Sequence, residues 1–459
     1  MEFSLPSAHD MRRAATTSVD GSDQLKFFDF AADSAIGDVT EGQVPVFEFD
    51  PALSHNIGSE SPLHRLFIGD NAHALTGLCD ERFDLIYIDP PYNTGKQFVY
   101  ADKYANGWCS FMYPRLKLAQ NVLKDTGVIM VAIGLAEQHR LRMLMDHIFG
   151  DENFIGQVHW ESGRKNDARF ISNSVDYMLV YAKSSSALRK SGAVWRERHP
   201  DADAYFDLAA QIWEGNAHIQ DIDERKTVSR KELVKRSRSK FGELPTSLSS
   251  YRMFTDRGVC YAGNGDLSFP GGKGYKYDVL HPMTGQVCAA PRSGYSCTEE
   301  TMTKWIADGY IEFGADHTVQ PKKRRYNYVG QSLGSVVTRS RRAAHSHVGA
   351  ILGKNVFHYP KDHHELAKWI GVAAGSDAKV LDFFGGSGST AEAVLLLNKQ
   401  DGGTREVTIV TNNDNNIGTD ITRERIVRVM TGENWADGIP HDGYGGRLAV
   451  WHVSAGAAH

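Results

Sequence analysis

The chain has 459 residues, which predicts two or more domains and a large buried core. Its composition is that of an ordinary globular protein, no apolar run approaches the ~20 residues of a membrane span, and the start of the chain, with Glu2 and Asp10, does not resemble a signal peptide. The five scattered cysteines favour a cytoplasmic protein without a disulfide framework, and their spacing falls short of that of a metal site. The net charge of −5 alone would argue against a nucleic-acid partner, but the charge is unevenly spread along the chain.

The first part of the chain alternates strand-like runs with segments of helical periodicity. Residues 1–60 precede this pattern and are predicted to form an acidic extension, because they carry a net charge of −8 and little apolar patterning. The alternation that follows is typical of a parallel sheet covered by helices on both faces. The predicted strands are residues 65–68, 83–88, 128–133 and 176–181, and the predicted helices are residues 72–78, 107–125 and 135–149.

The strand at residues 83–88 ends in Asp89-Pro90-Pro91-Tyr92. Two successive prolines cannot continue a central strand, so the chain must turn directly after Asp89. The turn then presents a carboxylate, a proline carbonyl and an aromatic ring. An exocyclic amine on a flat base needs two acceptors for its hydrogens and a ring to stack on, which fits this set. An ordinary turn at a strand end is the alternative, and these four residues alone leave the two open.

The alternation breaks near residue 185, and residues 186–345 are rich in glycine, serine and charge, which predicts a separate domain of mixed structure. Two runs in it, residues 225–240 and 322–342, each carry a net charge of +7. One basic run alone is usually a solvated helix face, but two in one segment favour a nucleic-acid surface. The predicted nucleic-acid-binding residues are Arg225, Lys226, Arg230, Lys231, Lys235, Arg236, Arg238, Lys322, Lys323, Arg324 and Arg325.

The strand–helix rhythm returns after residue 364. A predicted strand at residues 378–382 feeds a glycine-rich loop and a helix at residues 391–398, and a strand at residues 406–411 follows. Glycines let a backbone pass close to a ligand, and a helix amino terminus offers free N–H groups. The spacing is neither the dinucleotide fingerprint nor a phosphate-binding loop. We predict a nucleotide-type site at a sheet edge, with an unliganded glycine connection as the alternative.

Two motifs, "DLIYIDPPYNTG" and "LDFFGGSGST", resemble the catalytic and cofactor loops of amino-methylating DNA methyltransferases. The catalytic motif comes first, a basic segment follows and the cofactor motif comes last, which is the order of the beta class. Further stretches, such as "GGKGYKYDVLHPMTGQVC", resemble modification subunits of type III restriction systems and their orphan relatives. The chain departs from the family pattern at Pro360-Lys361-Asp362, where Pro-Lys-Pro is usual, and it is shorter than most such subunits.

The resemblance implies an α/β fold with a Rossmann-like methyltransferase sheet, helices on both its faces, a circularly permuted motif order and an inserted mixed α+β target-recognition domain. The implied parts are residues 1–60 (acidic extension), 61–185 (first methyltransferase part), 186–345 (target recognition), 346–430 (second methyltransferase part) and 431–459 (C-terminal tail). S-adenosylmethionine is the implied cofactor. The residues implied to hold it are Asp70, Pro360, Lys361, Asp382, Phe383, Phe384, Gly385, Gly386, Ser387, Gly388, Asn413 and Asp414, although Asp414 suits a loop cap equally well.

The implied reaction is methylation of the 6-amino group of adenine in double-stranded DNA, with base flipping and direct displacement. Asp89 and the Pro90 carbonyl would accept hydrogen bonds from the amine, Pro91 would stiffen the loop, and Tyr92 would stack on the base. Aspartate before the two prolines favours adenine. The alternatives are the 4-amino group of cytosine, RNA methylation, and a DNA-binding module with a degenerate pocket. The family also implies a homodimer in the bacterial cytoplasm, and leaves a restriction subunit as partner undecided.

Overall fold

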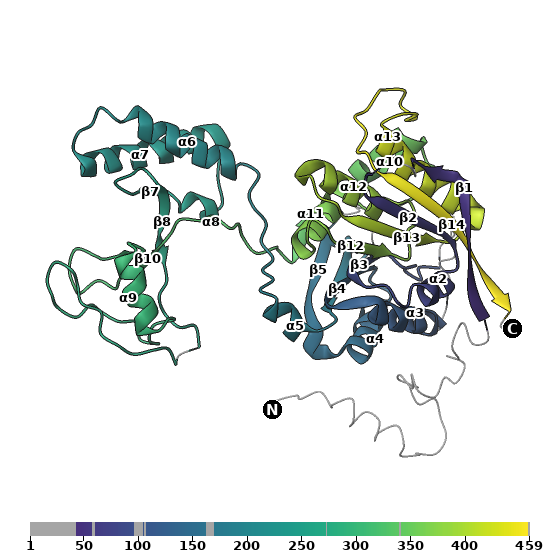
Figure 1. Cartoon of the computed structure of the whole chain (residues 1–459), viewed down its shortest axis with the longest axis horizontal. Coiled ribbons are helices and arrows are strands. Elements are labelled where there is room, and N and C mark those ends of the chain that lie inside the picture. The colour runs from purple at the N-terminus through teal and green to yellow at the C-terminus, as the bar shows by residue number, and fades with distance from the viewer. Residues whose placement is uncertain are drawn as a thin grey trace, which may run out of the picture. The chain divides into compact units, whose positions relative to one another are not determined.

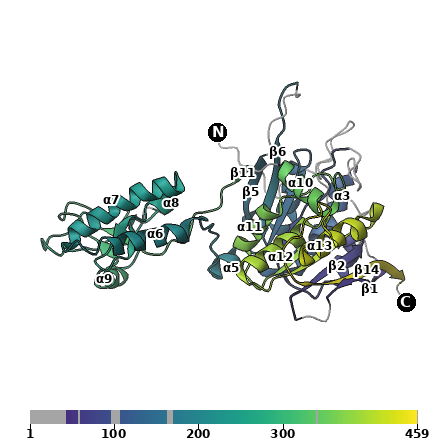
Figure 2. The ribbon, with the colours of Figure 1, turned by 90° about the horizontal axis from the view of Figure 1, so that it is seen from above.

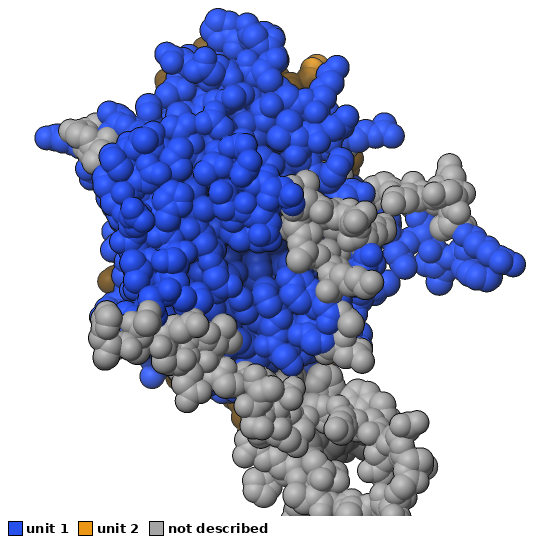
Figure 3. Space-filling view, turned by 90° about the vertical axis from the view of Figure 1, so that its right-hand side faces the viewer, with its two compact units in different colours: residues 1–195, 334–459 blue, residues 196–333 orange. Residues whose placement is uncertain are grey.

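The computed structural model describes residues 43–56, 60–95, 104, 107–161, 169–271, 273–338 and 341–457. The chain divides into two compact units, coloured separately in Figure 3. Unit 1 consists of residues 1–195 and 334–459, and unit 2 consists of residues 196–333. Unit 2 is therefore inserted into the sequence of unit 1. Among the described residues, no helix has the length and apolar character required to cross a membrane.

The described part of unit 1 is built on a ten-stranded sheet with the order β1-β14-β2-β13-β12-β3-β4-β6-β5-β11 (Figure 1). The strands from β14 to β4 in this order all pair in parallel. The bounds are β1 Gln43–His55, β2 Leu63–Gly69, β3 Phe83–Ile88, β4 Leu123–Ile133, β5 Phe154–Glu161, β6 Val175–Ala182, β11 Val336–Thr338, β12 Lys379–Asp382, β13 Glu406–Thr411 and β14 Arg447–Ala457.

The sheet is mixed, which corrects the expectation of a parallel sheet. β6 runs antiparallel to β5, the strand before it in the chain, and it also runs antiparallel to β4. At the other edge β1 pairs antiparallel with β14, although the sequence suggested an extension and a tail for these segments. Aromatic packing explains their place: Phe47 of β1 and Trp451 of β14 both lie against Phe67 of β2, with ring centroids 5.3 and 5.2 Å away.

Helices cover both faces of this sheet (Figures 1 and 2). α2, α3 and α4 lie on one face, where they bury apolar side chains against the strands, and α10 to α13 pack on the other. The bounds are α2 Asn71–Gly77, α3 Trp108–Val122, α4 Gln138–Phe149, η2 Asp151–Asn153, α5 Ser185–Lys190, α10 Arg341–Leu352, α11 His363–Ala373, α12 Ser389–Asp401, η3 Asp414–Asn416, η4 Ile417–Arg423 and α13 Glu424–Thr431.

The neighbouring strands β3 and β12 form the switch point of the sheet. Leu85 lies opposite Val380 and Ile86 opposite Leu381. From β3 the chain crosses through α3 to β4 on one side, and from β12 it crosses through α12 to β13 on the other. Crossovers between parallel strands have the same handedness. Two crossovers that leave in opposite directions along the sheet therefore place their helices on opposite faces, and a crevice opens beyond the carboxyl ends of the two strands. The predicted catalytic loop starts at the end of β3, and the predicted cofactor loop starts at the end of β12.

Unit 2 combines four helices with a four-stranded sheet of the order β7-β8-β10-β9 in its described part. Its longest helix, α7, begins where the Asp221 side chain accepts hydrogen bonds from Asp223 and Glu224, and it ends at Gly242. The bounds are α6 Ala202–Gly215, α7 Ile222–Phe241, α8 Thr246–Ser249, β7 Met253–Phe254, β8 Cys260–Gly265, α9 Glu299–Ala307, β9 Ile311–Glu312 and β10 Lys322–Arg325.

Candidate active site

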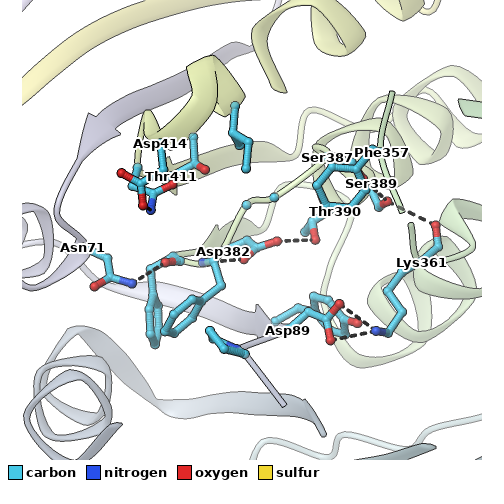
Figure 4. Close-up of a pocket in the computed structure, with 18 of the residues that line it drawn as sticks. Asn71, Asp89, Phe357, Lys361, Asp382, Ser387, Ser389, Thr390, Thr411 and Asp414 are labelled. Atoms are coloured by element: carbon cyan, nitrogen blue, oxygen red, sulfur yellow. Dashed lines mark hydrogen bonds and ion pairs between the residues drawn. The ribbon is translucent and has the colours of Figure 1, made fainter. Parts of the chain in front are cut away.

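A cavity of about 220 Å³ opens at the carboxyl ends of β3 and β12 (Figure 4), and we call it the switch-point cavity. It brings Asp89, which follows β3, together with the glycine loop, residues 383–388, which follows β12. The two predicted motifs, distant in the chain, therefore share one cavity. Of the residues predicted for the site, it is lined by Asp70, Asp89, Pro91, Pro360, Lys361, Asp382, Phe383, Phe384, Gly385, Gly386, Ser387 and Asp414.

The glycine loop needs its glycines for two reasons. Gly386 and Gly388 have φ angles of 50° and 79°, in the left-handed region that favours glycine. Gly385 donates its N–H to the Val410 carbonyl of β13 at 3.0 Å, and a Cβ at Gly385 would overlap the Ile409 side chain. The loop backbone is thus pressed against β13 on one side, while Gly385 and Gly386 line the cavity on the other.

Asp382 fastens the start of the glycine loop to α12. Its Oδ1 accepts a hydrogen bond from the Phe384 N–H at 2.9 Å, and its Oδ2 accepts one from the Thr390 hydroxyl at 2.6 Å. Burial raises the pKa of Asp382 to about 7, against the opposing effect of these two hydrogen bonds. Both carboxylate oxygens of Asp382 thus accept hydrogen bonds from the protein itself. Asp382, predicted to bind the cofactor, therefore fixes the conformation of the glycine loop.

A buried arginine supports the same loop from behind. Arg425 of α13 donates from Nη1 to the Ser387 carbonyl at 3.1 Å and to the Ser389 hydroxyl at 2.8 Å. Its Nε donates to Glu392 of α12 at 2.7 Å. Burial alone would raise the pKa of Glu392, but the Arg425 charge and a hydrogen bond from His347 outweigh it and keep that pKa below its ordinary value. This ion pair fixes the end of the glycine loop against two helices.

Side chains from α3 and from beyond β4 hold the turn that contains Asp89. The Trp108 indole N–H donates to the Pro91 carbonyl at 2.7 Å. Asn93, at a left-handed φ of 54°, donates to the buried Glu137 carboxylate at 2.7 Å and accepts from the Tyr104 N–H at 2.8 Å. The prolines themselves make this turn stiff. The hydrogen bonds of the Pro91 carbonyl and of the Asn93 side chain to neighbouring elements fix it further.

Tyr92 packs its ring against Gly134, the residue after β4. A Cβ at Gly134 would lie only 2.7 Å from Tyr92 Cδ2, so this position requires glycine or a shift of the ring. Burial raises the pKa of Tyr92 well above its ordinary value, and the nearby Asp89 charge raises it further. The phenol therefore stays neutral and keeps its proton available for a hydrogen bond.

Lys361 meets the catalytic motif directly. Its Nζ donates to Asp89 Oδ1 at 2.7 Å, to Asp89 Oδ2 at 2.6 Å and to the Tyr92 hydroxyl oxygen at 2.8 Å (Figure 4 shows the two bonds to Asp89). The Lys361 carbonyl accepts a hydrogen bond from the Ser389 hydroxyl at 3.1 Å. Lys361 was predicted to bind the cofactor. Its backbone does lie at the glycine loop, but its ammonium is hydrogen-bonded to Asp89, the predicted catalytic carboxylate.

A chain of polar contacts connects α3, α2 and the glycine loop. Asp70 caps α2 by accepting a hydrogen bond from the Ala72 N–H at 2.8 Å, and its other oxygen lies 3.1 Å from Arg115 Nη2. Arg115 Nε donates to Asn71 Oδ1 at 2.6 Å, and Asn71 Nδ2 donates to the Phe383 carbonyl at 2.8 Å. Asp70 therefore lines the cavity as part of a network that positions the loop.

Four predicted residues do not line the cavity: Pro90, Tyr92, Gly388 and Asn413. Asn413 accepts a hydrogen bond from the Thr419 N–H at 3.2 Å, which gives it a turn-capping role, whereas the neighbouring Asp414 does reach the cavity wall.

Other cavity residues were not singled out from the sequence. Asn71 and Ser389 stand next to predicted residues, and Thr390 follows Ser389. Thr411 ends β13 at the same edge and Asn412 follows it, so position gave a signal for all of these. Arg115 and Phe357 gave none, because their places depend on how α3 and the segment before α11 pack. The full set is Gly69, Asn71, Tyr87, Tyr104, Phe111, Arg115, Phe357, Tyr359, Ser389, Thr390, Thr411, Asn412 and Ile417.

Within unit 2, the two predicted basic runs meet in one cleft of about 890 Å³, which we call the α7 cleft. Lys226 and Arg230 reach it from α7, and Arg324 reaches it from β10. Its walls also carry three tyrosines and three acidic residues, so it offers cations, acceptors and rings together. These residues are Tyr261, Tyr310, Tyr326, Asp256, Asp308 and Glu312.

Some predicted basic residues are engaged elsewhere in unit 2. The Arg225 guanidinium lies 4.1 Å from the centre of the Trp213 ring system and donates to the Trp213 carbonyl, and Lys323 Nζ lies 3.2 Å from the centre of the Trp305 ring system. Arg236 pairs with Glu232 within α7. The remaining ones, Lys231, Lys235, Arg238, Lys322 and Arg325, are exposed.

Comparison with known proteins agrees with the two motifs. The family described as DNA methylase matches residues 83–430. The Mod subunit of the type III restriction-modification enzyme StyLTI of Salmonella typhimurium is 30% identical over 84% of this chain and 60% of its own length. The EcoP15I Mod subunit of Escherichia coli is 27% identical over 80% and 63%, and the type II methyltransferase M.KpnI of Klebsiella pneumoniae is 29% identical over 81% and 86%.

The chain thus spans about three fifths of the length of the two Mod subunits, and most of the length of the type II enzyme. The family match contains the Asp89 turn, the whole of unit 2 and the glycine loop. Because it extends over more than half of the chain, the chain belongs to the N6/N4 DNA methylase family, whose members depend on S-adenosylmethionine.

Proposed function

We propose that this chain is a site-specific methyltransferase that transfers a methyl group from S-adenosylmethionine to the 6-amino group of adenine in double-stranded DNA. One observation carries the proposal: the Asp89 carboxylate and the glycine loop line the same cavity at the switch point of the sheet. The carboxylate can accept a hydrogen bond from an amine, and the backbone loop can hold a cofactor. Because both line one cavity, they can act on two reactants that are bound there together.

The cavity has groups that suit S-adenosylmethionine. Gly385 and Gly386 bring bare backbone to its wall, and Asp70 and Asp414 offer carboxylates at the ends of β2 and β13. The Tyr87 hydroxyl is buried, belongs to the cavity lining and has no hydrogen-bond partner among the described residues. We assign the methionine end to the glycine loop and the adenosine end to Asp70 and Asp414. When bound, the cofactor supplies an electrophilic methyl group on a sulfonium.

The residues of the Asp89 turn orient the accepting nitrogen. Asp89 and the Pro90 carbonyl accept hydrogen bonds from the target amine, which aims the nitrogen lone pair. Tyr92 provides the ring on which the flipped base stacks, with a contribution of roughly 1–3 kcal/mol that offsets part of the few kcal/mol spent on unpairing. The aspartate before the two prolines favours adenine over cytosine, by the resemblance of this motif to the family pattern.

We assign DNA binding to the basic residues of unit 2, with the α7 cleft as their centre, and interpret the motif order as the circular permutation of the beta class. In this proposal unit 2 is the target-recognition domain. The type III relatives are named as Mod subunits of larger enzymes, which supports assembly with other subunits. We propose a homodimer on duplex DNA, with a restriction subunit as a further partner to be tested by co-purification.

The test is to incubate the purified protein with isotope-labelled S-adenosylmethionine and genomic duplex DNA of varied origin, and then to digest the DNA to nucleosides. Label in N6-methyladenine supports the proposal, whereas label in N4-methylcytosine moves the target to cytosine. Absence of label from all DNA samples would contradict the function.

Asp89→Ala provides the sharper test of the site. Transfer should fall below detection, because the amine loses its charged acceptor, while the dissociation constant for the cofactor stays within about threefold of wild type. Asp80→Ala is a matched control, since Asp80 is exposed and lies outside the cavity. A parallel loss of cofactor affinity and rate in Asp89→Ala would show that the assigned role is wrong.

A further inference from the structure

The Lys361 ammonium occupies the acceptor positions that the proposed mechanism reserves for the target amine. It donates to both oxygens of Asp89, at 2.7 and 2.6 Å, and to the Tyr92 hydroxyl oxygen. The side chains of Lys361 and Asp89 are 15% and 27% exposed, so the pair is partly withdrawn from water. An ammonium and an exocyclic amine are both nitrogen donors, and here they would compete for one carboxylate.

The backbone of Lys361 is fixed although its side chain is long. Its carbonyl is bonded to Ser389, which is itself held by Arg425. The next residue, Asp362, caps α11 by accepting hydrogen bonds from His364 and Glu365. A flexible four-carbon stem thus carries the charged group from an anchored point at the glycine loop. The ammonium can leave Asp89 while the backbone keeps its place at the cofactor loop.

We propose that Lys361 is a positioning residue that holds the amine-binding place on Asp89 until the flipped base displaces it. The proposal rests on the function proposed above and deepens it, because it says how the acceptor is kept ready before the base arrives. The exchange breaks the contacts of the ammonium with Asp89 and forms those of the target amine, without any covalent step. As a consequence, the entering base must break the ion pair between Lys361 and Asp89, which reduces the apparent affinity for DNA.

The surroundings of Asp89 explain why a cation is needed there. The titratable groups that act on this region are Lys361 from the segment before α11, Tyr92 of the same turn, Tyr87 of β3, Asp382 of β12 and Asp176 of β6. Apart from Lys361, these groups are carboxyls or phenols. Without the ammonium, the Asp89 carboxylate would be left with carboxyl and phenol neighbours and no cation from this set.

The experiment compares the wild type with Lys361→Met, which removes the charge, and Lys361→Arg, which keeps it. With genomic duplex DNA as substrate, kcat and KM are measured from about pH 6 to pH 9. Lys361→Met should lower KM for DNA by about threefold or more at high pH, because the competing donor is gone.

Lys361→Arg should raise KM for DNA, since a guanidinium pairs with a carboxylate through two parallel bonds and is released less readily. Lys368→Met is the matched control, because Lys368 is a lysine of α11 outside the cavity, and it should follow the wild type. An unchanged KM for DNA in Lys361→Met would overturn the proposal. So would an equal loss of kcat at every pH in both Lys361 variants.

A second measurement does not depend on activity. Trace acylation of lysines followed by mass spectrometry reports how freely each amine reacts. The Lys361 amine should react several-fold faster in Asp89→Asn than in the wild type, while Lys368 reacts equally in both. Equal labelling of Lys361 in the two proteins would refute the ion pair in solution. If the wild type methylates no DNA yet Lys361 labelling responds to Asp89→Asn, the proposed function fails while the ion pair stands.

Discussion

The ring of Tyr92 lies directly against the backbone of Gly134, so the residue that follows β4 sets the position of the aromatic ring next to Asp89 in the chain. Gly134→Ala would place a methyl group 2.7 Å from Tyr92 Cδ2, and the ring would have to move. Because small displacements of a positioning group are costly, we expect kcat for DNA methylation to fall by about 10- to 100-fold with little change in cofactor affinity. Steady-state kinetics and calorimetric titration of the cofactor check this.

Gly156→Ala of β5 is the matched control for that substitution, since a Cβ there meets nothing within 4 Å. It should leave both kcat and cofactor affinity unchanged. Equal activity of Gly134→Ala and Gly156→Ala would mean that the Tyr92 position does not matter for transfer.

Asp382 should make the stability of the protein depend on pH around neutrality. Its pKa is raised by burial to about 7 in the folded chain from an ordinary 3.8, so the folded state binds its proton more tightly than the unfolded state. The folded state is therefore progressively disfavoured as the pH rises from about 4 to about 7. Asp382→Asn removes this ionisation, and its Tm relative to the wild type should rise between pH 5 and pH 8.

The measurement is thermal unfolding of both proteins in matched buffers, with the exposed Asp377→Asn as control. The expected gain in unfolding free energy is at most a few kcal/mol, because an amide cannot keep both of the hydrogen bonds from Phe384 and Thr390 in their present form. A constant Tm difference across this pH range would contradict the prediction.

His363 should make unit 1 sensitive to acid. Burial lowers its pKa from an ordinary 6.5 to about 3, although the nearby Glu392 charge acts in the opposite direction. The unfolded chain therefore binds a proton here that the folded chain does not, and stability is lost as the pH falls below about 6.5. His363→Gln should flatten the decline of Tm between pH 7 and pH 5. The exposed neighbour His364→Gln should leave the slope unchanged, and equal slopes in both variants would refute the prediction.

The α7 cleft should carry more of the DNA affinity than the rest of the basic helix. Arg230 lines the cleft, whereas Lys235 is exposed on the same helix outside it. Arg230→Ala should weaken binding to mixed duplex DNA and reduce the slope of log affinity against log salt by about 1, as expected for one lost phosphate contact. Lys235→Ala should have the smaller effect. Fluorescence anisotropy at several salt concentrations measures both, and the reverse ranking would place the DNA elsewhere.

The sequence predicts that the two motifs meet at one sheet edge, because each motif directly follows a buried strand. Strand runs such as residues 83–88 are recognisable from their own composition, and parallel strands present their carboxyl ends at one edge. The meeting of Asp89 with the glycine loop therefore required only the assumption that β3 and β12 belong to one sheet. Gly386 gave a further local signal, since its φ of 50° lies in the left-handed region that favours glycine.

What the sequence did not indicate depends on partners far away in the chain. β1 and β14 find their places through contacts of Phe47 and Trp451 with β2, and neither segment has a strong pattern of its own. The role of Arg115 arises from the packing of α3 on α2, and the contact of Lys361 with Asp89 arises from where α11 begins. Long side chains reach partners that periodicity cannot reveal.

The adjacency of β3 and β12 has a consequence for how the protein is made. A ribosome finishes β3 early and reaches β12 only after all of unit 2 has been synthesised. During that interval the edge of β3 that will pair with β12 has no partner strand. A chain released before β12 would lack half of the cavity. Nascent molecules should therefore depend on protection of this exposed edge, and enzymatic competence should emerge late in translation, in a single step.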